Sequence, residues 1–405
     1  MTAPASNTTT TASTAPTRSM NTGVVVVAAI ALVGLGYGSH ATGGGRMLAL
    51  LAVGGALGIS LFHASFGFTG SWRSFLVERR GAGVRSQMAM FAVASAAFLP
   101  LLEWGSPFGG SLGGAVAPAG VSVIVGAFLF GVGMQLGGSC ASGSLYVLGG
   151  GRTRTAVTLV FFMAGSLLGS LHLPWWLTMP RLPAISLQGE LGTMPALLFC
   201  WGVFGSIALT TKLLERRAAE PAVTRQQVAD GPVLQRLVRG PWPLLAGGMA
   251  LAALNVATLL ISGHPWSVSF GYALWGAKAA TALGIDVAAW SFWTWPYPKA
   301  ALAGGLLDED TSVMNFGILA GAFLAAGLAG RFAPLRRVPP RQILAAIVGG
   351  LLMGYGARLA FGCNIGALFS GIASGSLHGW LWLVCGVAGN ALGVHLRPRF
   401  GLANT

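Results

Sequence analysis

Charged residues are scarce in this sequence. Asp, Glu, Lys and Arg make up 8% of the 405 residues, only ten residues are acidic, and hydrophobic residues make up 54%. The mean hydropathy is +0.70. A soluble globule of this size needs far more polar surface than such a composition supplies. The composition therefore excludes a soluble domain and predicts that the chain is surrounded by lipid.

Cysteine is also rare, and its spacing excludes several kinds of site. Four cysteines are too few for a disulfide framework in a chain of this length. They form no Cys-x-x-Cys pair and no Cys/His spacing typical of a metal site, and the chain has no Walker sequence for ATP. We therefore expect no metal, no cofactor and no ATP-driven step within this chain.

Long apolar runs dominate the sequence instead. A membrane-spanning helix needs about 20 apolar residues, and runs of that length recur along the chain. The 62 glycines are spread through nearly all of them, as is common where membrane helices pack closely. We predict an all-α, polytopic membrane protein with nine or ten spans, at residues 21–39, 47–62, 86–102, 119–139, 153–172, 194–213, 243–262, 313–331, 341–360 and 378–396.

The N-terminal region precedes the first predicted span. Residues 1–20 are rich in Thr, Ser, Ala and Pro and are predicted to be a disordered tail. The first apolar run has a weakly charged start and no clear small-residue cleavage site before Gly36. We expect this run to remain as a membrane helix; removal as a signal peptide is the alternative.

The net charge of +14 indicates orientation rather than nucleic-acid binding. If the loop from Lys212 to Arg239 is cytoplasmic, alternation of the spans places 19 of the 24 Lys and Arg on that side, as positive residues prefer. We therefore predict a multi-pass protein of the bacterial inner membrane with both termini in the cytoplasm. Asp308, Glu309 and Asp310 are expected in a solvated loop on the opposite side.

Two segments share one pattern. Gly131 to Tyr146 and Gly354 to Phe369 both read G-x-G-x-x-L-x-x-x-C-x-x-G-small-L-aromatic, and a fainter pair begins at His63 and His264. Alternating spans give the two motif helices opposite directions, which predicts inverted repeats with a substrate site at their interface. The predicted organisation is a tail at 1–20, an extra helix at 21–44, a first repeat at 45–175, a connecting helix and loop at 176–240, a second repeat at 241–397, and a cytoplasmic tail at 398–405.

Four short segments accompany the spans, at 65–76, 142–150, 266–280 and 364–374. Each is too short to cross a bilayer and too apolar for a solvent loop. Irregular backbone at membrane depth is tolerated only when it is buried in protein or lines a cavity. We therefore predict four re-entrant half-helices that form the walls of a pathway.

Cys140 and Cys363 sit where a long helix meets a half-helix, after glycines that let the backbone turn. A thiol is a weak, polarisable donor, suited to a soft sulfur anion that must be held and then released. The alternative is that both thiols only pack a helix bend, but their matched positions favour the pathway. Asn364 is included in the predicted pathway, whereas Cys200 and Cys385 are expected to pack within ordinary spans.

An anion inside a low-dielectric path needs positive potential from helix N-termini or basic side chains. Arg358 lies five residues before the cysteine of the second motif, and Gln135 is its counterpart in the first. Lys278 and Arg73 occupy comparable places in the two halves and are also predicted pathway residues. Snorkelling to the interface is the alternative for both.

At these cysteine motifs the chain resembles the YeeE/YedE sulphur-transport family, whose characterised members take up thiosulfate. The resemblance covers most of residues 45–397 and is most specific at Gly131 to Leu145 and Gly354 to Leu368. It implies an hourglass-shaped fold of two inverted halves. It also implies that Cys140 and Cys363 pass thiosulfate along a narrow central path by S–H hydrogen bonds.

A third cysteine of that family has no counterpart here. The family pattern places a cysteine shortly before Thr-Gly-x-x-Arg, and Gly67 stands in its place. Ser65 and Thr69 are nearby hydroxyls that could donate hydrogen bonds instead. The inner end of the predicted cysteine path therefore differs from the family pattern.

The leading hypothesis is uptake of thiosulfate or a related small sulfur anion by a transporter rather than an enzyme. One alternative is a sulfur relay, in which a cysteine persulfide hands sulfur to a cytoplasmic TusA-like carrier protein. That chemistry needs an activated thiolate, and neither motif has an adjacent His or Lys. Another alternative is a structural or signalling subunit. The sequence leaves open the coupling ion and the choice between thiosulfate, sulfite and selenium anions.

Overall fold

The computed structural model describes residues 19–218, 232–334 and 337–404. Most of the tail predicted at 1–20, and the centre of the loop from Lys212 to Arg239, lie outside these residues. The described chain is almost entirely helical, with one short ribbon in which β1 (Pro118–Gly120) pairs antiparallel with β2 (Arg181–Ala184). The prediction of an all-α polytopic membrane protein is confirmed.

The long helices coincide with the predicted spans. The described residues contain nine helical stretches that are long and apolar enough to cross a membrane, the first of them running from Thr22 to Glu78. Each of the other eight matches one predicted span. The long helices are α1 (Thr22–Ala64), α3 (Ala82–Trp104), α4 (Val121–Gly137), α6 (Thr153–Trp176), α8 (Thr193–Arg217), α10 (Leu244–Ser262), α13 (Asp310–Leu328), α14 (Pro340–Leu359) and α16 (Leu377–Leu396).

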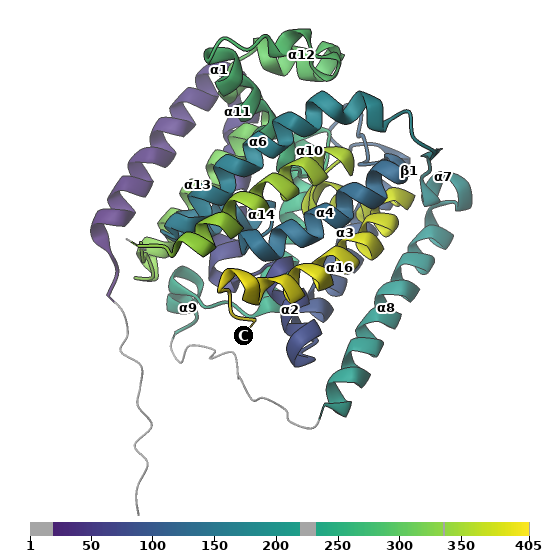
Figure 1. Cartoon of the computed structure of the whole chain (residues 1–405), viewed down its shortest axis with the longest axis horizontal. Coiled ribbons are helices and arrows are strands. Elements are labelled where there is room, and N and C mark those ends of the chain that lie inside the picture. Colours follow the sequence, from purple (N-terminus) through teal and green to yellow (C-terminus); the bar gives the residue numbers. More distant parts are fainter. Residues whose placement is uncertain (1–18, 219–231, 335–336, 405) are drawn as a thin grey trace, which may run out of the picture.

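Helix α1 comprises two of the predicted spans. Its backbone is non-helical at Gly43 and Gly44, where Gly44 has φ of 63°, a conformation that glycine adopts without a Cβ penalty. The break separates the runs predicted at 21–39 and 47–62. Figure 1 shows the first limb lying along the outside of the bundle, and its apolar side chains, such as Val33 and Tyr37, are exposed. Because its exposed side chains are apolar, this limb requires contact with lipid.

Shorter elements connect the long helices. Four of them correspond to the segments predicted to be half-helices: α2 (Phe68–Glu78), α5 (Ala141–Gly149), α11 (Ser269–Ala282), and the π-helical turn η4 (Asn364–Phe369) continued by α15 (Ser370–Ala373). The others lie near the ends of the bundle. They are α7 (Leu187–Leu191), α9 (Val233–Arg239), η1 (Val287–Ala289), η2 (Ser291–Thr294), α12 (Pro296–Ala303), η3 (Leu306–Asp308) and η5 (Arg397–Phe400).

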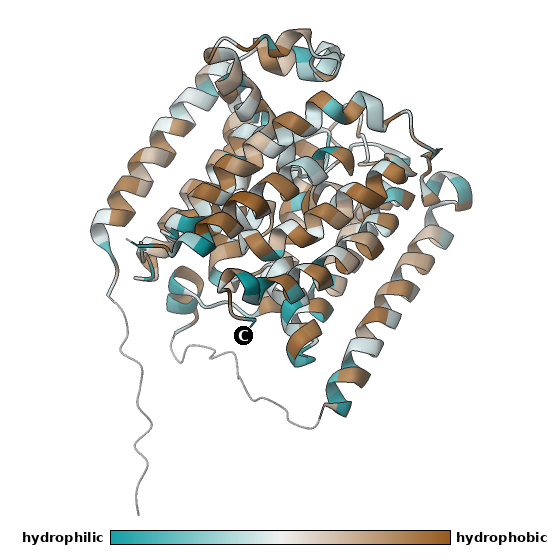
Figure 2. Cartoon of the chain, in the orientation of Figure 1, coloured by the Kyte–Doolittle hydropathy of each residue, from teal (hydrophilic) through white to brown (hydrophobic). Residues whose placement is uncertain are grey.

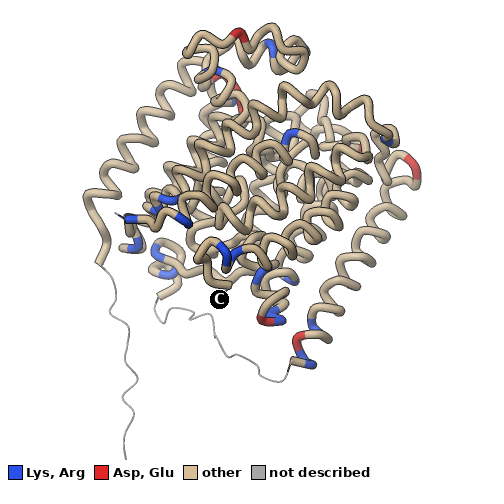
Figure 3. The backbone as a smooth tube through the Cα atoms, viewed as in Figure 1, with Lys and Arg blue, Asp and Glu red and all other residues tan. Residues whose placement is uncertain are grey.

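Hydropathy and charge define two opposite faces of the bundle. Apolar residues cover the long helices, and polar residues gather near their ends (Figure 2). Lys and Arg are concentrated at one end, which we call the basic face and which carries α2, α9 and the C-terminal residues (Figure 3). The start of α1 lies at the same end (Figure 1). The opposite end carries α7 and α12 and far fewer basic residues, and we call it the opposite face.

The two motif helices touch backbone to backbone. Helices α4 and α14 pack against each other, and glycines occupy the contact. A Cβ added at Gly349 would lie 2.2 Å from the Gly137 nitrogen, and one at Gly356 would lie 2.4 Å from the Gly126 oxygen. Small residues that allow such close approach are characteristic of helix pairs in membranes. Glycines within the repeated motifs, Gly137 and Gly356, together with Gly126 and Gly349 just before them, therefore set the distance between the two helices.

Similar contacts hold neighbouring helices. A Cβ at Gly321 of α13 would lie 2.1 Å from the Gly55 oxygen of α1, and one at Gly354 of α14 would lie 2.1 Å from the Phe162 oxygen of α6. On the other side, a Cβ at Gly389 of α16 would lie 2.0 Å from the Phe128 oxygen of α4. The motif helices are thus fixed from several directions by contacts that leave no room for side chains.

Replacing Gly349 by valine is expected to destabilise the protein. The added side chain would collide with backbone atoms of α4, and overpacking of this kind costs about 1–3 kcal/mol. The matched control is Gly202→Val, because a Cβ there has nothing within 4 Å. Thermal unfolding in detergent should show a lower midpoint for Gly349→Val alone. Equal midpoints would contradict the packing described here.

Candidate functional site

The two cysteines of the repeated motif occupy matching breaks in the helices. Helix α4 ends at Gly137, and Cys140 is the residue before α5, with φ −83° and ψ −173°. Helix α14 ends at Leu359, and Cys363 precedes η4 with φ −86° and ψ −172°. The predicted position of both cysteines at a helix break is confirmed, and their backbone conformations are almost identical.

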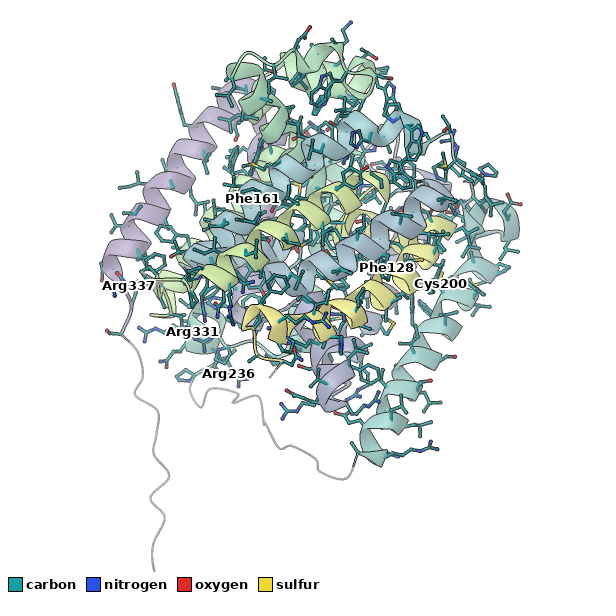
Figure 4. All side chains as sticks on the ribbon, viewed as in Figure 1. Phe128, Phe161, Cys200, Arg236, Arg331 and Arg337 are labelled. Carbon is teal, nitrogen blue, oxygen red and sulfur yellow. The ribbon has the colours of Figure 1, made fainter. Side chains whose placement is uncertain are left out.

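Both thiols are buried, and each rests on the first turn of its short helix. The Cys363 sulfur accepts a hydrogen bond from the Ile365 nitrogen at 3.4 Å, and the Cys140 sulfur lies 3.7 Å from the Ser142 hydroxyl. The exposed fractions are 0% and 2% for Cys363 and Cys140. The two other cysteines lie elsewhere: Cys200 is on α8, at the edge of the bundle (Figure 4), and Cys385 is on α16.

Tyr272 joins the surroundings of the two thiols. This tyrosine lies on α11, and its hydroxyl donates a hydrogen bond to the Ala141 oxygen at 2.9 Å. Ala141 directly follows Cys140, and α5 contacts η4, the turn that directly follows Cys363. The short helices from the two parts of the chain therefore meet in one buried region.

Hydrogen bonds fix the segment that enters α11. The Trp266 nitrogen donates to the Asn255 side chain at 2.8 Å, the Asn255 amide donates to the Ser370 hydroxyl at 3.2 Å, and that hydroxyl donates to the Trp266 oxygen at 2.8 Å. Asn315 on α13 donates to the Val268 oxygen at 3.0 Å. Buried backbone outside regular structure needs such partners. The segment is thereby held against α10, α13 and α15.

Aromatic rings fill the space between the short helices. Trp382 of α16 contacts Trp72 of α2 and Phe130 of α4, with ring centroids 6.4 and 5.5 Å apart. Phe162 of α6 then bridges Phe130 and Tyr272, at 6.3 and 4.7 Å. Such edge-on and tilted contacts favour the ring quadrupoles. The chain of rings joins five helices around the buried region.

A cavity of about 780 Å³ lies among α10, α11, α12, α13 and the end of α14. Arg358 and Phe361 from the end of α14 line it, together with Ser267 and Ser269 at the start of α11. The rest of its wall combines hydroxyls, acidic groups, one further arginine and apolar side chains. These residues are Arg46, Thr258, Ser262, His264, Pro265, Phe270, Tyr297, Ala300, Ala301, Gly304, Gly305, Asp308, Glu309, Asp310, Thr311 and Met314.

Two carboxylates in the cavity wall are neutralised by partners. Asp310 forms an ion pair with Arg46 and accepts a hydrogen bond from the Ser262 hydroxyl at 2.8 Å. Glu309 caps α13, accepting from the Thr311 and Ser312 nitrogens at 2.9 and 2.7 Å. A helix N-terminus stabilises negative charge in this way. Asp308, the third carboxylate of the wall, is exposed and accepts a hydrogen bond from the Gly305 nitrogen at 2.6 Å, but it has no ion-pair partner in the described chain.

The prediction of a solvated acidic loop is wrong for Glu309. Its exposed fraction is 4%, because its carboxylate turns inward to cap the helix. It also accepts a hydrogen bond from the Tyr297 hydroxyl at 2.9 Å. Burial and the Glu309 carboxylate raise the pKa of Tyr297, so this phenol remains a donor. Asp308 is exposed, as predicted.

Arg358 supplies positive charge to the cavity. Its side chain is largely buried, and its guanidinium lies 5.1 Å from the Phe292 ring and 5.9 Å from the Phe270 ring. Within the described part of the chain it has no ion-pair partner, and its Nε has no hydrogen-bond partner. A buried cation without a carboxylate carries an unbalanced charge. Cation–π contacts offset only part of this cost.

The cavity approaches the turn that carries Cys363. Ser267 lines the cavity, and its hydroxyl would lie 3.1 Å from a Cβ at Gly366, in the first turn of η4. Ser269 also lines the cavity, and its hydroxyl has no hydrogen-bond partner. Neither thiol is itself part of the wall. The second cysteine motif therefore borders the cavity without opening into it.

The predicted residues of the first half gather on the side of Cys140 toward the basic face. Gln135 is buried and donates to the Thr69 oxygen at 2.9 Å and to the Asn390 side chain at 2.6 Å. The hydroxyl of Thr69 is buried and has no partner. Gly67 precedes α2, and Arg73 lies one turn beyond Thr69 in the same helix.

Three other predicted residues have different surroundings. The Lys278 ammonium donates to the Leu302 and Gly304 oxygens at 2.9 and 2.6 Å, so it caps the end of α12 and does not line the cavity. Ser65 is exposed at the end of α1. Asn364 is fully buried beside Cys363, and neither atom of its amide has a hydrogen-bond partner. Of the three, only Asn364 lies beside a thiol.

Sequence reasoning missed the tyrosines and serines of the site. Tyr272, Ser267 and Ser269 were not predicted, although tyrosine is one of the rarest residues in the chain, with five copies. A buried tyrosine in a lipid-surrounded protein needs a partner for its hydroxyl. That requirement, applied to each tyrosine in a half-helix, is the signal that could have identified Tyr272.

The sequence matches one protein family and several named transporters. A family model described as sulphur transport matches residues 63–392. The probable transporter YedE of Escherichia coli is 32% identical over 162 residues, which is 39% of this chain and 39% of that protein. The match therefore spans about two fifths of the length of YedE.

Two thiosulfate transporters match more of the chain. TsuA of Spirochaeta thermophila is 28% identical over 280 residues, which is 67% of this chain and 76% of that protein. TsuA of Escherichia coli is 24% identical over 371 residues, which is 87% of this chain and 96% of that protein. Because the family model covers most of the sequence and both cysteine motifs, this chain belongs to the sulphur transport family.

Proposed function

We propose that this chain carries thiosulfate or a related small sulfur anion across the bacterial inner membrane, from the opposite face to the basic face. The observation that carries the proposal is Arg358, a largely buried cation without an ion-pair partner in the described chain, in a cavity that borders the Cys363 turn. The names of the TsuA relatives support the choice of anion.

The cavity is the proposed entry site. A divalent anion loses its hydration on entering a low-dielectric region and needs compensating charge. Arg358 provides that charge, while the hydroxyls of Ser267 and Ser269 stand at the start of α11, where backbone N–H groups are free. The carboxylates of Glu309 and Asp310 already have partners, so they oppose the anion less, and the unpaired Asp308 is exposed to solvent, which screens its charge.

The two thiols form the proposed central step. Cys140 and Cys363 each precede a short helix, and these two short helices contact each other. A thiol is a soft and weak donor. A weak donor can hold an anion without trapping it. The short helices belong, in this proposal, to two inverted repeats at 45–175 and 241–397, which form an hourglass around the thiols. Asn364 and Gln135 add polar groups beside the two motifs.

The basic face is proposed to be cytoplasmic. Its concentration of Lys and Arg (Figure 3) matches the preference of positive residues for the cytoplasmic side. Figure 4 places Arg236, Arg331 and Arg337 there. Both ends of the chain would then be cytoplasmic. Delivery to a TusA-like sulfur-carrier protein on this side is part of the proposal.

Replacing either central cysteine by alanine is expected to lower the initial rate of thiosulfate uptake by about tenfold or more. The loss of one hydrogen-bond donor raises the free energy of the step at that cysteine, and a rise of about 1.4 kcal/mol corresponds to a tenfold lower rate. Uptake of radiolabelled thiosulfate is measured in proteoliposomes with Cys140→Ala and Cys363→Ala. Cys200→Ala is the control, since Cys200 lies at the edge of the bundle.

The same preparations test the alternative functions. Unchanged uptake in either central variant would remove that thiol from the path, and absence of uptake by the parent chain would reject thiosulfate transport. Mass spectrometry after exposure to thiosulfate distinguishes a sulfur relay. A persulfide at Cys140 or Cys363 during turnover would favour the relay, whereas unmodified thiols fit passage by hydrogen bonding.

Replacing Arg358 by glutamine is expected to raise the thiosulfate concentration for half-maximal uptake by about tenfold or more, because a hydrogen bond to a charged group contributes about 1.5–3 kcal/mol. Arg358→Lys should retain part of the affinity, since it keeps the charge but loses the planar fork. Arg181→Gln is the matched control, because Arg181 is exposed outside the cavity. An unaltered half-maximal concentration in Arg358→Gln would exclude this arginine from the entry site.

A further inference from the structure

Tyr146 lies between Cys140 and the start of α2. A Cβ added at Gly143 would have the Cys140 sulfur 3.1 Å away on one side and the Tyr146 ring 3.9 Å away. A Cβ added at Gly67 would have the Tyr146 hydroxyl oxygen 3.4 Å away. One edge of the Tyr146 ring therefore lies near the Cys140 thiol, and the Tyr146 hydroxyl lies next to Gly67.

The hydroxyl of Tyr146 is free to bind a ligand. In the described part of the chain it has no hydrogen-bond partner, whereas the hydroxyl of Tyr272 donates to a backbone oxygen. Tyr146 is half-buried, although residues 141–145 before it are buried. A half-buried phenol hydroxyl without a protein partner can donate a hydrogen bond to an anion that reaches the central thiol.

The start of α2 offers further donors at the same place. Gly67 precedes the helix and has no side chain to cap it, so the first N–H groups of this 11-residue helix lack intrahelical partners. The Thr69 hydroxyl is 3% exposed and has no hydrogen-bond partner. A helix N-terminus favours an anion. The buried Thr69 hydroxyl is an independent polar group without a partner at the same end.

The basic face supplies positive charge beyond this point. Arg73 lies four residues after Thr69 and is partly buried. Arg397 interacts electrostatically with Arg73 and Arg154, and it donates to the Gln135 oxygen at 2.7 Å. Arg73 belongs to α2 and Arg397 to the C-terminal turn η5, and both of these elements lie at the basic face (Figure 1). An anion that leaves Cys140 therefore moves toward increasing positive potential.

We propose that the Tyr146 hydroxyl, together with the start of α2 at Gly67 and Thr69, forms an inner anion site that receives the sulfur anion from Cys140. The inference rests on the proposed function and names a further residue for it. Gly67 leaves the space into which the hydroxyl reaches, at the position where the family resemblance places a cysteine. A phenol O–H is a stronger donor than a thiol. Tyr146 thus takes the role of the absent thiol.

The test compares Tyr146→Phe with Tyr146→Phe/Gly67→Cys in proteoliposomes containing the full chain. Tyr146→Phe should lower initial uptake of labelled thiosulfate by about tenfold, as expected when one hydrogen bond to an anion is lost. The double variant should recover most of the rate, because a thiol then projects into the same space. Gly67 has φ of −161°, which cysteine adopts without strain. Tyr37→Phe, on an exposed residue, is the control for losing a phenol oxygen.

The outcomes separate this inference from the proposed function. If Cys140→Ala loses uptake while Tyr146→Phe keeps it, the inner site is wrong and the transport proposal stands. If Tyr146→Phe loses uptake and Gly67→Cys does not restore it, the tyrosine acts only through packing and the inference is also overturned. If the parent chain takes up no thiosulfate, the proposed function itself fails.

A second measurement does not depend on the Tyr146 variants. In Gly67→Cys alone, a membrane-impermeant maleimide applied from the basic face should label Cys at position 67, and mass spectrometry identifies the peptide. Thiosulfate should slow the labelling, because it occupies the same space. Absence of labelling, or labelling that thiosulfate does not change, would contradict an inner anion site.

Discussion

The site depends on the close packing of α4 against α14, in which glycines let the two helix backbones touch directly. Side chains of any size at Gly126, Gly133, Gly349 or Gly356 would collide with backbone of the partner helix and move the two helices apart, and the turns that follow them would separate too. Because the turns carry Cys140 and Cys363, glycine packing sets the distance between the thiols. In lipid, where apolar side chains gain little from meeting each other, close backbone packing is a principal source of helix association.

The charge of the side chains differs between the three regions of the proposed path. At the cavity, the carboxylates of Glu309 and Asp310 are held by a helix N-terminus and by Arg46, while Arg358 keeps an unbalanced charge. At the centre, the groups are neutral thiols and a phenol. Toward the basic face, arginines cap the end of α4. On the proposed path an anion would meet one strong positive group, then weak donors, then a basic surface, an order that favours entry without permanent binding.

Hydropathy predicted the fold well because lipid imposes both the length and the composition of a spanning helix. Even the break at Gly43 and Gly44 fell between two predicted spans. The repeated motif likewise located the helix breaks at Cys140 and Cys363. Partners from distant segments could not be predicted in the same way. The inward turn of Glu309 depends on Tyr297, and the use of Lys278 as a cap depends on the end of α12.

The break in α1 also has a mechanical meaning. Arg46 stands just after it and donates to the Ile261 and Ser262 oxygens of α10 while pairing with Asp310 of α13. The inner limb is therefore braced to the rim of the cavity. The outer limb is held near both of its ends, where the Asn21 nitrogen donates to the Gly327 oxygen at 2.9 Å and the Thr42 hydroxyl donates to the Leu307 oxygen at 3.0 Å. A change in the tilt of the outer limb with bilayer thickness would therefore be passed to Leu307, which directly precedes the acidic residues of the cavity wall.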